Sequence, residues 1–156
     1  MIISHNPNGG KFSLPDTIVI HCMSEYLTKE DGDRIHAVDF LLEQGLSAHA
    51  LVTPDGEIFR CREDTEGAYH AKGFNSNSLG IEFLVRGLHN YDSFVTAIKT
   101  PYLTDKQFEA GITQCKEWLA AFKIIKVTRH SDLSPGRKVD PGFGFPWRDF
   151  LKRIGR

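Results

Sequence analysis

The sequence predicts one mixed α/β domain with a central mixed β-sheet flanked by helices. Short apolar, β-branched runs of strand length alternate along the chain with segments whose apolar residues recur at helical spacing. The chain has 156 residues, of which 40% are hydrophobic, so it can bury one core but is too short for two ordinary domains. We therefore expect residues 1–156 to form a single domain.

Three strands and a helix are expected in the first part of the chain. Thr17 to His21 is a β-branched run that follows a Pro-Asp turn and ends at a histidine. A helix is expected next, capped by Asp33 and ended by Gly45, with apolar residues at helical spacing between them. Residues 49–60 then predict two strands joined by the turn Pro54-Asp55-Gly56.

The second part of the chain predicts two more strands and two more helices. Leu79 to Val85 is an apolar run short enough to be a strand. Thr104 and Gln107 have the spacing of a capping box and open the most strongly patterned helix of the sequence. A short strand is expected at residues 126–128, and Pro146 is suited to the first position of a terminal helix.

Charge and hydropathy exclude several classes of protein. Nineteen Lys and Arg against 20 Asp and Glu give a formal charge of −1, so we expect no nucleic-acid partner. No apolar run approaches the roughly 20 residues of a membrane span, and the first residues do not resemble a secretion signal. We therefore expect a monomer made in the cytoplasm without a signal peptide and without a membrane partner. Three widely spaced cysteines predict neither a disulfide framework nor a thiolate zinc site.

A candidate metal site lies near the C-terminus, in RHSDLSPGRKVDPG, which carries His130, Lys138 and Asp140 on one loop. Together with His21 at a strand end, these residues offer two imidazoles and a carboxylate, which can hold Zn²⁺ and leave a coordination place for water, as in hydrolases. Asp132 competes with Asp140 for the ligand role, and spacing alone does not decide between them. Non-haem iron oxygenases use the same ligand types, but would need an all-β fold and a later histidine.

Glu82 is a carboxylate within the apolar strand predicted at residues 79–85. Strand alternation places Ile81 and Phe83 on one face and leaves Glu82 beside Gly80 on the other. Because a buried glutamate without a partner is costly, both a structural ion pair and a catalytic carboxylate are open at this point.

Four blocks of the chain, TIVIH, SAHALVTPDGEIFRCRE, YHAKGFNSNSLGIEF and RHSDLSPGRKVDPG, occur in an order that resembles the zinc-dependent N-acetylmuramoyl-L-alanine amidases. This family includes phage lysozyme-type endolysins, anhydro-muropeptide amidases and peptidoglycan recognition proteins. The resemblance implies a mixed sheet with helices on it and Zn²⁺ in a surface groove, bound by His21, His130 and Asp140 and not by Asp132. It also implies hydrolysis of the amide bond between N-acetylmuramic acid and L-alanine.

The resemblance further implies roles for other side chains. Glu82 matches the general base of the anhydro-muropeptide amidases, and Lys138 matches a loop lysine that could stabilise an oxyanion. The phage branch instead uses a tyrosine just before the SAH-type histidine, where this chain has Ala48, and this departure shifts the role of base to Glu82. The residues expected to contact substrate, directly or from behind, are His49, Tyr69, His70, Phe74, Asn75 and Asn77.

Within this family we expect a phage or prophage endolysin, a bacteriolytic and antimicrobial enzyme that acts on the cell wall after release into the periplasm. The short segment between Tyr69 and Gly80 and the absence of residues for a separate wall-binding module favour this branch. A cytosolic recycling amidase that acts on anhydro-muropeptides is the alternative. A non-catalytic peptidoglycan recognition module is a second alternative, which would lack a zinc ligand.

Overall fold

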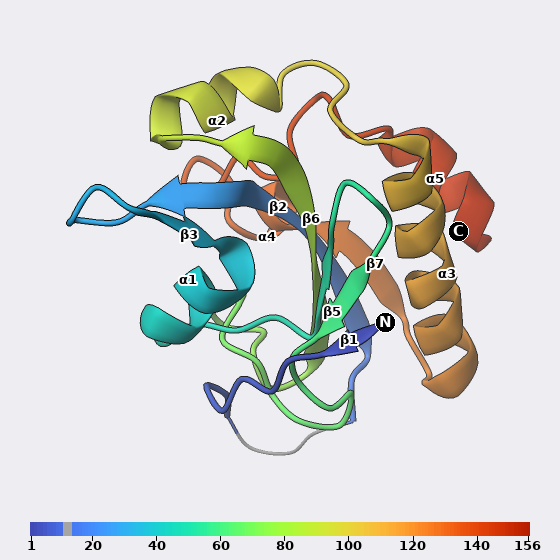
Figure 1. Cartoon of the computed structure of the whole chain (residues 1–156). Helices are drawn as coiled ribbons and strands as arrows, with labels where there is room; N and C mark the ends of the chain where they lie inside the picture. Colours follow the sequence, from blue (N-terminus) through green and yellow to red (C-terminus); the bar gives the residue numbers. More distant parts are fainter. Residues whose placement is uncertain (11–13) are drawn as a thin grey trace.

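The computed structural model describes residues 1–10 and 14–156, and it confirms a mixed sheet flanked by helices (Figure 1). Within these residues the sheet has seven strands in the order β1-β5-β4-β6-β2-β3, with β7 also paired to β2. The strands are β1 (Ile2–Ile3), β2 (Thr17–Thr28), β3 (Arg34–His36), β4 (Ala50–Val52), β5 (Ile58–Arg60), β6 (Ser78–Leu88) and β7 (Lys126–Arg129). The helices are α1 (Ala37–Glu43), α2 (Tyr91–Ala97), α3 (Asp105–Ala121), α4 (His130–Leu133) and α5 (Trp147–Ile154).

The two long strands β2 and β6 run parallel at the centre of the sheet. Their register pairs His21 with Glu82, so these two side chains stand next to each other on the same face. On its other edge, β2 pairs with β7 over Thr17–Ile20 and with the antiparallel strand β3 over Tyr26–Thr28. On this edge of β2, residues 21–25 have no strand partner because β7 ends before them and β3 begins after them. The chain that follows β7 approaches β2 at these residues.

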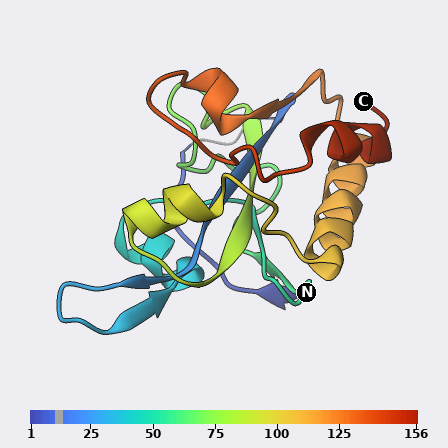
Figure 2. The same cartoon turned by 90° about the horizontal axis from the view of Figure 1, so that it is seen from above.

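Helices cover both faces of the sheet, with α3 and α5 on one side and α1 on the other (Figure 2). The larger core lies under α3 and α5 and includes Ile20, Phe83 and Phe150, all fully buried. The smaller core lies under α1 and includes Leu51 and Leu84. Since side chains alternate along a strand, His21 and Glu82 belong to the α1 face, where the smaller core leaves room for a groove.

The helix predicted from Thr104 is α3, and its predicted capping box is confirmed. The Thr104 hydroxyl accepts from the backbone N–H of Gln107 at 3.1 Å, and the Gln107 side chain accepts from the N–H of Thr104. The buried Gln107 amide also donates to the carbonyls of Val52 and Leu84, which fixes the helix to two strands. One turn later, Gly111 packs directly against the ring of Phe83.

The helix predicted from Asp33 is wrong in its first turn. Residues Arg34–His36 form β3, which pairs with β2 and buries Ile35 against the sheet. Helix α1 begins only after His36, whose Nδ1 accepts from the N–H of Val38 at 3.2 Å. The hairpin pairing therefore overrides the helical spacing that the apolar residues suggest.

Helices α2 and α4 are additions to the two or three helices that the sequence predicts. Helix α2 is capped by Asn90 and Ser93 in a reciprocal capping box, and its apolar residues Tyr91, Phe94 and Val95 recur at helical spacing over only two turns. Helix α4 has only four residues. Both are too short to show a sustained periodic pattern in the sequence.

Other predictions from composition can be compared directly with the structure. The three cysteines are free and buried. In the part of the chain that the structure describes, no helix combines the length and the apolar character needed to cross a membrane.

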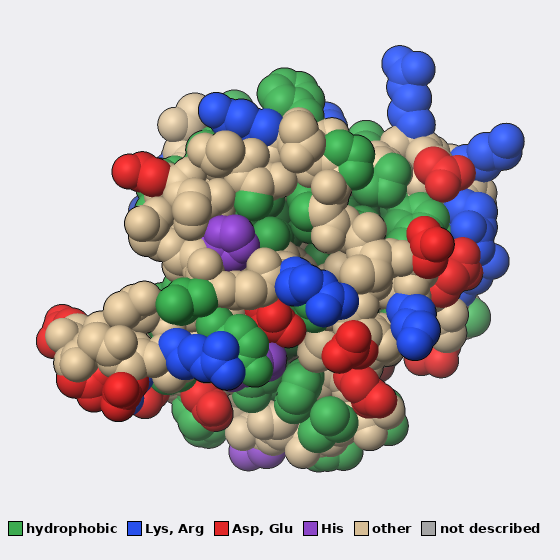
Figure 3. Space-filling model, turned by 45° about the horizontal axis from the view of Figure 1, so that its top comes forward, with side chains coloured by type: hydrophobic (Ala, Val, Ile, Leu, Met, Phe, Trp, Pro, Cys, Tyr) green, Lys and Arg blue, Asp and Glu red, His purple; other side chains and the backbone are tan. Residues whose placement is uncertain are grey.

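Acidic side chains gather where the β2–β3 hairpin projects from the body, at the left of Figure 3.

Candidate metal centre

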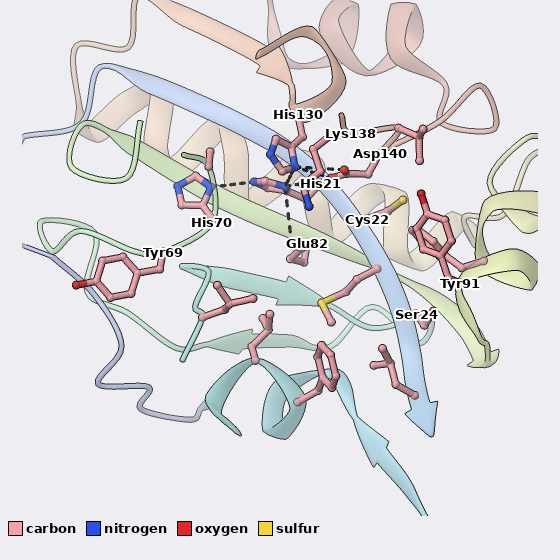
Figure 4. A pocket seen from close by; sticks show the side chains of 18 of the residues that line it. His21, Cys22, Ser24, Tyr69, His70, Glu82, Tyr91, His130, Lys138 and Asp140 are labelled. Atoms are coloured by element: carbon pink, nitrogen blue, oxygen red, sulfur yellow. Dashed lines mark hydrogen bonds and ion pairs between the residues drawn. The ribbon is translucent and has the colours of Figure 1, made fainter. Parts of the chain in front are cut away.

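Three side chains from separate elements meet on the α1 face of the sheet (Figure 4). His21 comes from the middle of β2, His130 is the first residue of α4 directly after β7, and Asp140 lies on the loop that follows. Nδ1 of His21 lies 3.0 Å from Nδ1 of His130 and 3.1 Å from Oδ2 of Asp140. Nδ1 of His130 lies 3.2 Å from the same oxygen. The fold thus brings together the three residues that the sequence suggests as ligands.

The loop that carries Asp140 is held from two sides. Its backbone carbonyl accepts from the N–H of Ser131 at 3.0 Å, which ties the loop to α4. The carbonyl of the next residue, Pro141, accepts from the Tyr102 hydroxyl at 2.8 Å and lies 3.5 Å from Sγ of Cys22. A Cβ at Gly144 would lie 1.9 Å from the Thr100 carbonyl oxygen, so the loop packs closely on the segment between α2 and α3.

These donor atoms have the chemistry and the spacing of a metal site. Ligand atoms at 2.0–2.1 Å from a tetrahedral Zn²⁺ would be about 3.3 Å apart, close to the observed separations of 3.0, 3.1 and 3.2 Å. Among residues 1–10 and 14–156, His21, His130 and Asp140 form the one group of three or more His, Cys, Asp or Glu residues arranged in this way. Imidazole and carboxylate together suit Zn²⁺.

Burial shifts the protonation of this cluster. Desolvation lowers the pKa of His21, against the raising effect of the Asp140 carboxylate beside it. Burial alone would raise the pKa of Asp140, but the adjacent imidazoles of His130 and His21 outweigh it and hold the pKa below its ordinary value. A neutral imidazole at His21 beside an ionised carboxylate at Asp140 is the combination of protonation states that binds a metal ion.

Glu82 reaches the same place from β6. Its Oε1 lies 3.9 Å from Nδ1 of His21, and its Oε2 is buried without a hydrogen-bond partner among the described residues. Burial, and then the charge of Asp140, raise the pKa of Glu82 well above its ordinary value, while the charge of Lys138 opposes them. An unpaired buried carboxylate that faces a cluster of ligands is typical of a functional site.

Asp132 lies outside the cluster. Its carboxylate accepts from Nε and an Nη of Arg129 at 2.8 and 3.2 Å on the exposed side of α4. This ion pair engages both of its oxygens, which leaves Asp140 as the carboxylate that the structure brings to the two histidines.

The cluster lies in a groove with a volume of about 750 Å³. Tyr69, His70 and Asn75 line this groove, together with Lys138. Figure 3 shows basic side chains beside the hollow on this face of the molecule. Sequence reasoning missed further lining residues on the β2–β3 hairpin, α1 and α2, which are Leu27, Phe40, Leu41, Tyr91 and Phe94. They come from three separate elements, so no local motif marks them.

His70 stands directly behind His21. Its Nδ1 lies 2.8 Å from Nε2 of His21, on the side of that ring away from Asp140 (Figure 4). Its backbone N–H and that of Ala71 both donate to Oδ1 of Asn75, at 3.0 and 2.8 Å. Asn75 thus shapes the turn that presents His70.

The remaining residues expected to contact substrate are placed elsewhere by the structure. His49 is fully buried; its Nδ1 accepts from the N–H of Gly80 and its Nε2 lies 2.8 Å from the Glu66 carbonyl. The Asn77 amide donates to Asp16 at 3.1 Å, and Phe74 offers its backbone carbonyl to the Ser78 hydroxyl. His49, Phe74 and Asn77 do not line the groove as the described residues define it. Both ring nitrogens of His49 are engaged within the protein.

Curated relatives of this chain are amidases. It is 33% identical over 115 residues to the 1,6-anhydro-N-acetylmuramyl-L-alanine amidase AmpD of Enterobacter cloacae, an alignment that covers 67% of this chain and 55% of that protein. The chain therefore spans about half the length of the curated relatives it matches.

Solved structures share the fold over nearly the whole chain. The N-acetylmuramoyl-L-alanine amidase LysC from Clostridium intestinale URNW superposes with a TM-score of 0.72 at 21% identity, over 99% of this chain and 96% of that one. The amidase AmiD from E. coli, in complex with anhydro-N-acetylmuramic acid-L-Ala-D-gamma-Glu-L-Lys, gives a TM-score of 0.70 at 25% identity, over 91% of this chain and 58% of that one.

A profile of one protein family, described as N-acetylmuramoyl-L-alanine amidase, matches residues 11–143. The match includes His21, His130 and Asp140, together with the strands and loops that position them. Since it covers most of the chain, this protein belongs to the N-acetylmuramoyl-L-alanine amidase family.

Proposed function

We propose that this protein hydrolyses the amide bond between N-acetylmuramic acid and L-alanine in peptidoglycan. The observation that carries the proposal is the meeting of His21, His130 and Asp140 with the buried carboxylate of Glu82 in one groove. Two relatives support the substrate class, since the Enterobacter protein is an amidase of this bond type and the E. coli protein is bound to a muropeptide.

Zn²⁺ is the cofactor that we assign to these three residues. The ligand types and their separations support this assignment. When bound, Zn²⁺ supplies Lewis acidity, which polarises a carbonyl group and lowers the pKa of water.

Glu82 acts as the general acid and base of the proposed reaction. Its carboxylate takes a proton from the attacking water as the water oxygen bonds to the lactyl carbonyl carbon. It then gives that proton to the L-alanine nitrogen as the carbon–nitrogen bond breaks, so a carboxylic acid and a free amine leave. A raised pKa suits a group that must both accept and return a proton.

Lys138 stabilises the negative charge that develops on the carbonyl oxygen in this proposal. It lines the groove on the loop of Asp140, and its charge is close enough to lower the pKa of both Glu82 and His21. A fixed positive charge near the reacting carbonyl favours the tetrahedral oxyanion over the neutral substrate.

The groove walls provide contacts for the rest of the substrate. Tyr69, 40% exposed, and Tyr91, 69% exposed, offer flat apolar surface to sugar or peptide. Lys72 and Arg137 add positive charge at the groove, which complements the acidic residue of a stem peptide.

Purified sacculi and elemental analysis test the proposal. We expect about one Zn²⁺ per chain, release of peptides with a free N-terminal L-alanine, and loss of release in a chelator. Full activity without metal, or iron in place of zinc, contradicts the assignment of the cofactor. Binding of muropeptide without release of peptide would instead indicate a recognition module.

The physiological form of the substrate separates two versions of this proposal. An endolysin that acts on the intact wall is supported by the short turn between Tyr69 and Gly80, closed by the bonds from Phe74 N to Ala71 O and from Asn77 N to Phe74 O. A recycling amidase is supported by the sequence relatives named for anhydro-muropeptide hydrolysis. Turnover of intact sacculi and of soluble anhydro-muropeptide, compared at equal bond concentration, distinguishes them.

A further inference from the structure

A series of hydrogen bonds leads from the candidate ligand His21 into the interior of the fold. Nε2 of His21 lies 2.8 Å from Nδ1 of His70, and Nε2 of His70 lies 3.0 Å from the hydroxyl of Ser78. That hydroxyl lies 2.6 Å from the backbone carbonyl oxygen of Phe74. The four groups form one continuous series from the middle of β2, through Ser78 at the start of β6, to the turn that precedes β6.

The far end of this series fixes the direction of every bond in it. A carbonyl oxygen only accepts, so Ser78 donates to Phe74 and its oxygen is free to accept from Nε2–H of His70. A neutral imidazole carries one N–H, so Nδ1 of His70 accepts from Nε2–H of His21. The remaining nitrogen of His21, Nδ1, then has a lone pair directed at His130 and Asp140.

We infer that His70 is a positioning residue which, together with Ser78, holds His21 in the Nε2-protonated tautomer that can bind a divalent cation through Nδ1. The inference rests on the proposed function, since it takes His21 as a zinc ligand. Ligating histidines commonly donate their second N–H to a carboxylate, a carbonyl or water. Here the acceptor is a second imidazole, which accepts only while its own proton is on the far nitrogen, and Ser78 is the group that keeps it there.

The fold makes a dedicated place for the His70 ring. A Cβ at Gly80 would lie 2.5 Å from Nδ1 and 2.7 Å from Cγ of His70, so the ring occupies the space above β6 that a side chain would fill. Oδ1 of Asn75 holds the backbone at this position by accepting from the N–H groups of His70 and Ala71. By contrast, Nε2 of His130 is buried without a hydrogen-bond partner among the described residues, so the control of tautomer acts on one of the two histidines.

Zinc affinity measured by competition with a chromophoric chelator tests this role. We expect His70→Phe, which keeps a flat ring but removes the acceptor, to bind Zn²⁺ roughly 10–100-fold more weakly than the parent. His70→Gln restores an oxygen that can accept from His21 and should recover part of the affinity. The control is His5→Gln, which changes an exposed histidine outside the groove and should retain the parental affinity.

Nitrogen-detected NMR of the zinc-loaded parent protein reads the tautomers directly. We expect His21 and His70 both to be protonated at Nε2, with the Nδ1 of His70 shifted as a hydrogen-bond acceptor. Ser78→Ala removes the group that orients His70, and we expect it to populate the Nδ1-protonated form of that ring and to weaken zinc binding less than His70→Phe does.

The outcomes separate the two proposals. A parent protein that does not bind Zn²⁺ overturns both. A parent that binds Zn²⁺ while His70→Phe binds it equally tightly overturns the role of His70 alone. An Nδ1-protonated His70 in the parent overturns it as well, and this measurement does not depend on any variant folding.

Discussion

Replacement of Glu82 by glutamine separates the proposed chemistry from metal binding. The side chain is 11% exposed, its Oε1 lies 3.9 Å from Nδ1 of His21, and its Oε2 makes no hydrogen bond within the described chain. An amide of the same shape therefore fits the space and removes only the basicity. General acid–base groups contribute roughly 10²–10⁴-fold to rate, which corresponds to about 2.7–5.4 kcal/mol of activation free energy. We expect Glu82→Gln to lose activity within this range.

Unlike the activity, the stability of the metal-free protein should not fall in Glu82→Gln. Burial and the charge of Asp140 raise the pKa of Glu82 in the folded state above its ordinary value of 4.5. The folded state then binds more protons than the unfolded state between these two pKa values, so stability falls as pH rises through that window. Glutamine has no such ionisation cost. The metal-free variant should therefore unfold at a temperature at least as high as the parent's at neutral pH.

Three measurements on one preparation decide the matter, namely peptide release from sacculi, zinc content and thermal unfolding. Glu117→Gln on the exposed side of α3 is the matched carboxylate-to-amide control and should leave all three unchanged. A Glu82→Gln protein that keeps most of its activity would refute the role of base. A variant that fails to fold would show that Glu82 has a structural ion pair instead.

Four further variants test the site and the packing. Asp140→Ala should empty the metal site by elemental analysis, whereas Asp132→Ala should leave it filled, and the reverse result would exchange their roles. In Gly111→Ala a Cβ would meet the Phe83 ring at 2.3 Å, so an overpacking cost at the upper end of roughly 1–3 kcal/mol should exceed the gain of about 1 kcal/mol in helix propensity. Urea unfolding should show a less stable protein, and an equally stable one would contradict this packing. Burial lowers the pKa of His49 from 6.5 to about 4, so protons favour the unfolded chain as pH falls. Between about pH 7.5 and about pH 5 the parent should lose about 2 kcal/mol more stability than His49→Gln. An equal change in the free energy of unfolding of both proteins over this range would contradict the prediction.

Much of the scaffold is encoded locally. The capping box at Thr104, the turn at residues 54–56 and the alternation around Glu82 each act over a few residues, and each is found in the structure. The register of β2 against β6 is different, because it depends on the packing of both strands in the complete sheet. The sequence alone could therefore place Glu82 on the face opposite the core but could not pair it with His21.

The incorrect predictions also concern residues whose positions depend on contacts between distant parts of the chain. Ile35 lies at helical spacing from the residues of α1, yet it belongs to β3, since pairing with β2 is available only in the folded hairpin. His49 and His70 come from similar motifs, but one has both ring nitrogens engaged inside the fold and the other stands behind a ligand. The feature that favours His70 in its position is the missing Cβ of Gly80, ten residues further along, and short motifs do not reveal such a contact.

The candidate ligands join parts of the chain that are far apart, because His21 and His130 are separated by 109 positions. An ion bound between them would act as a reversible cross-link that closes a very long loop. The entropy of closing this loop is lost when the chain folds, before the ion binds. Its binding free energy is then available only to the complete fold, and each tenfold excess of ion over its dissociation constant would add about 1.4 kcal/mol to global stability. Zinc supply would thus set the lifetime of the protein as well as its activity.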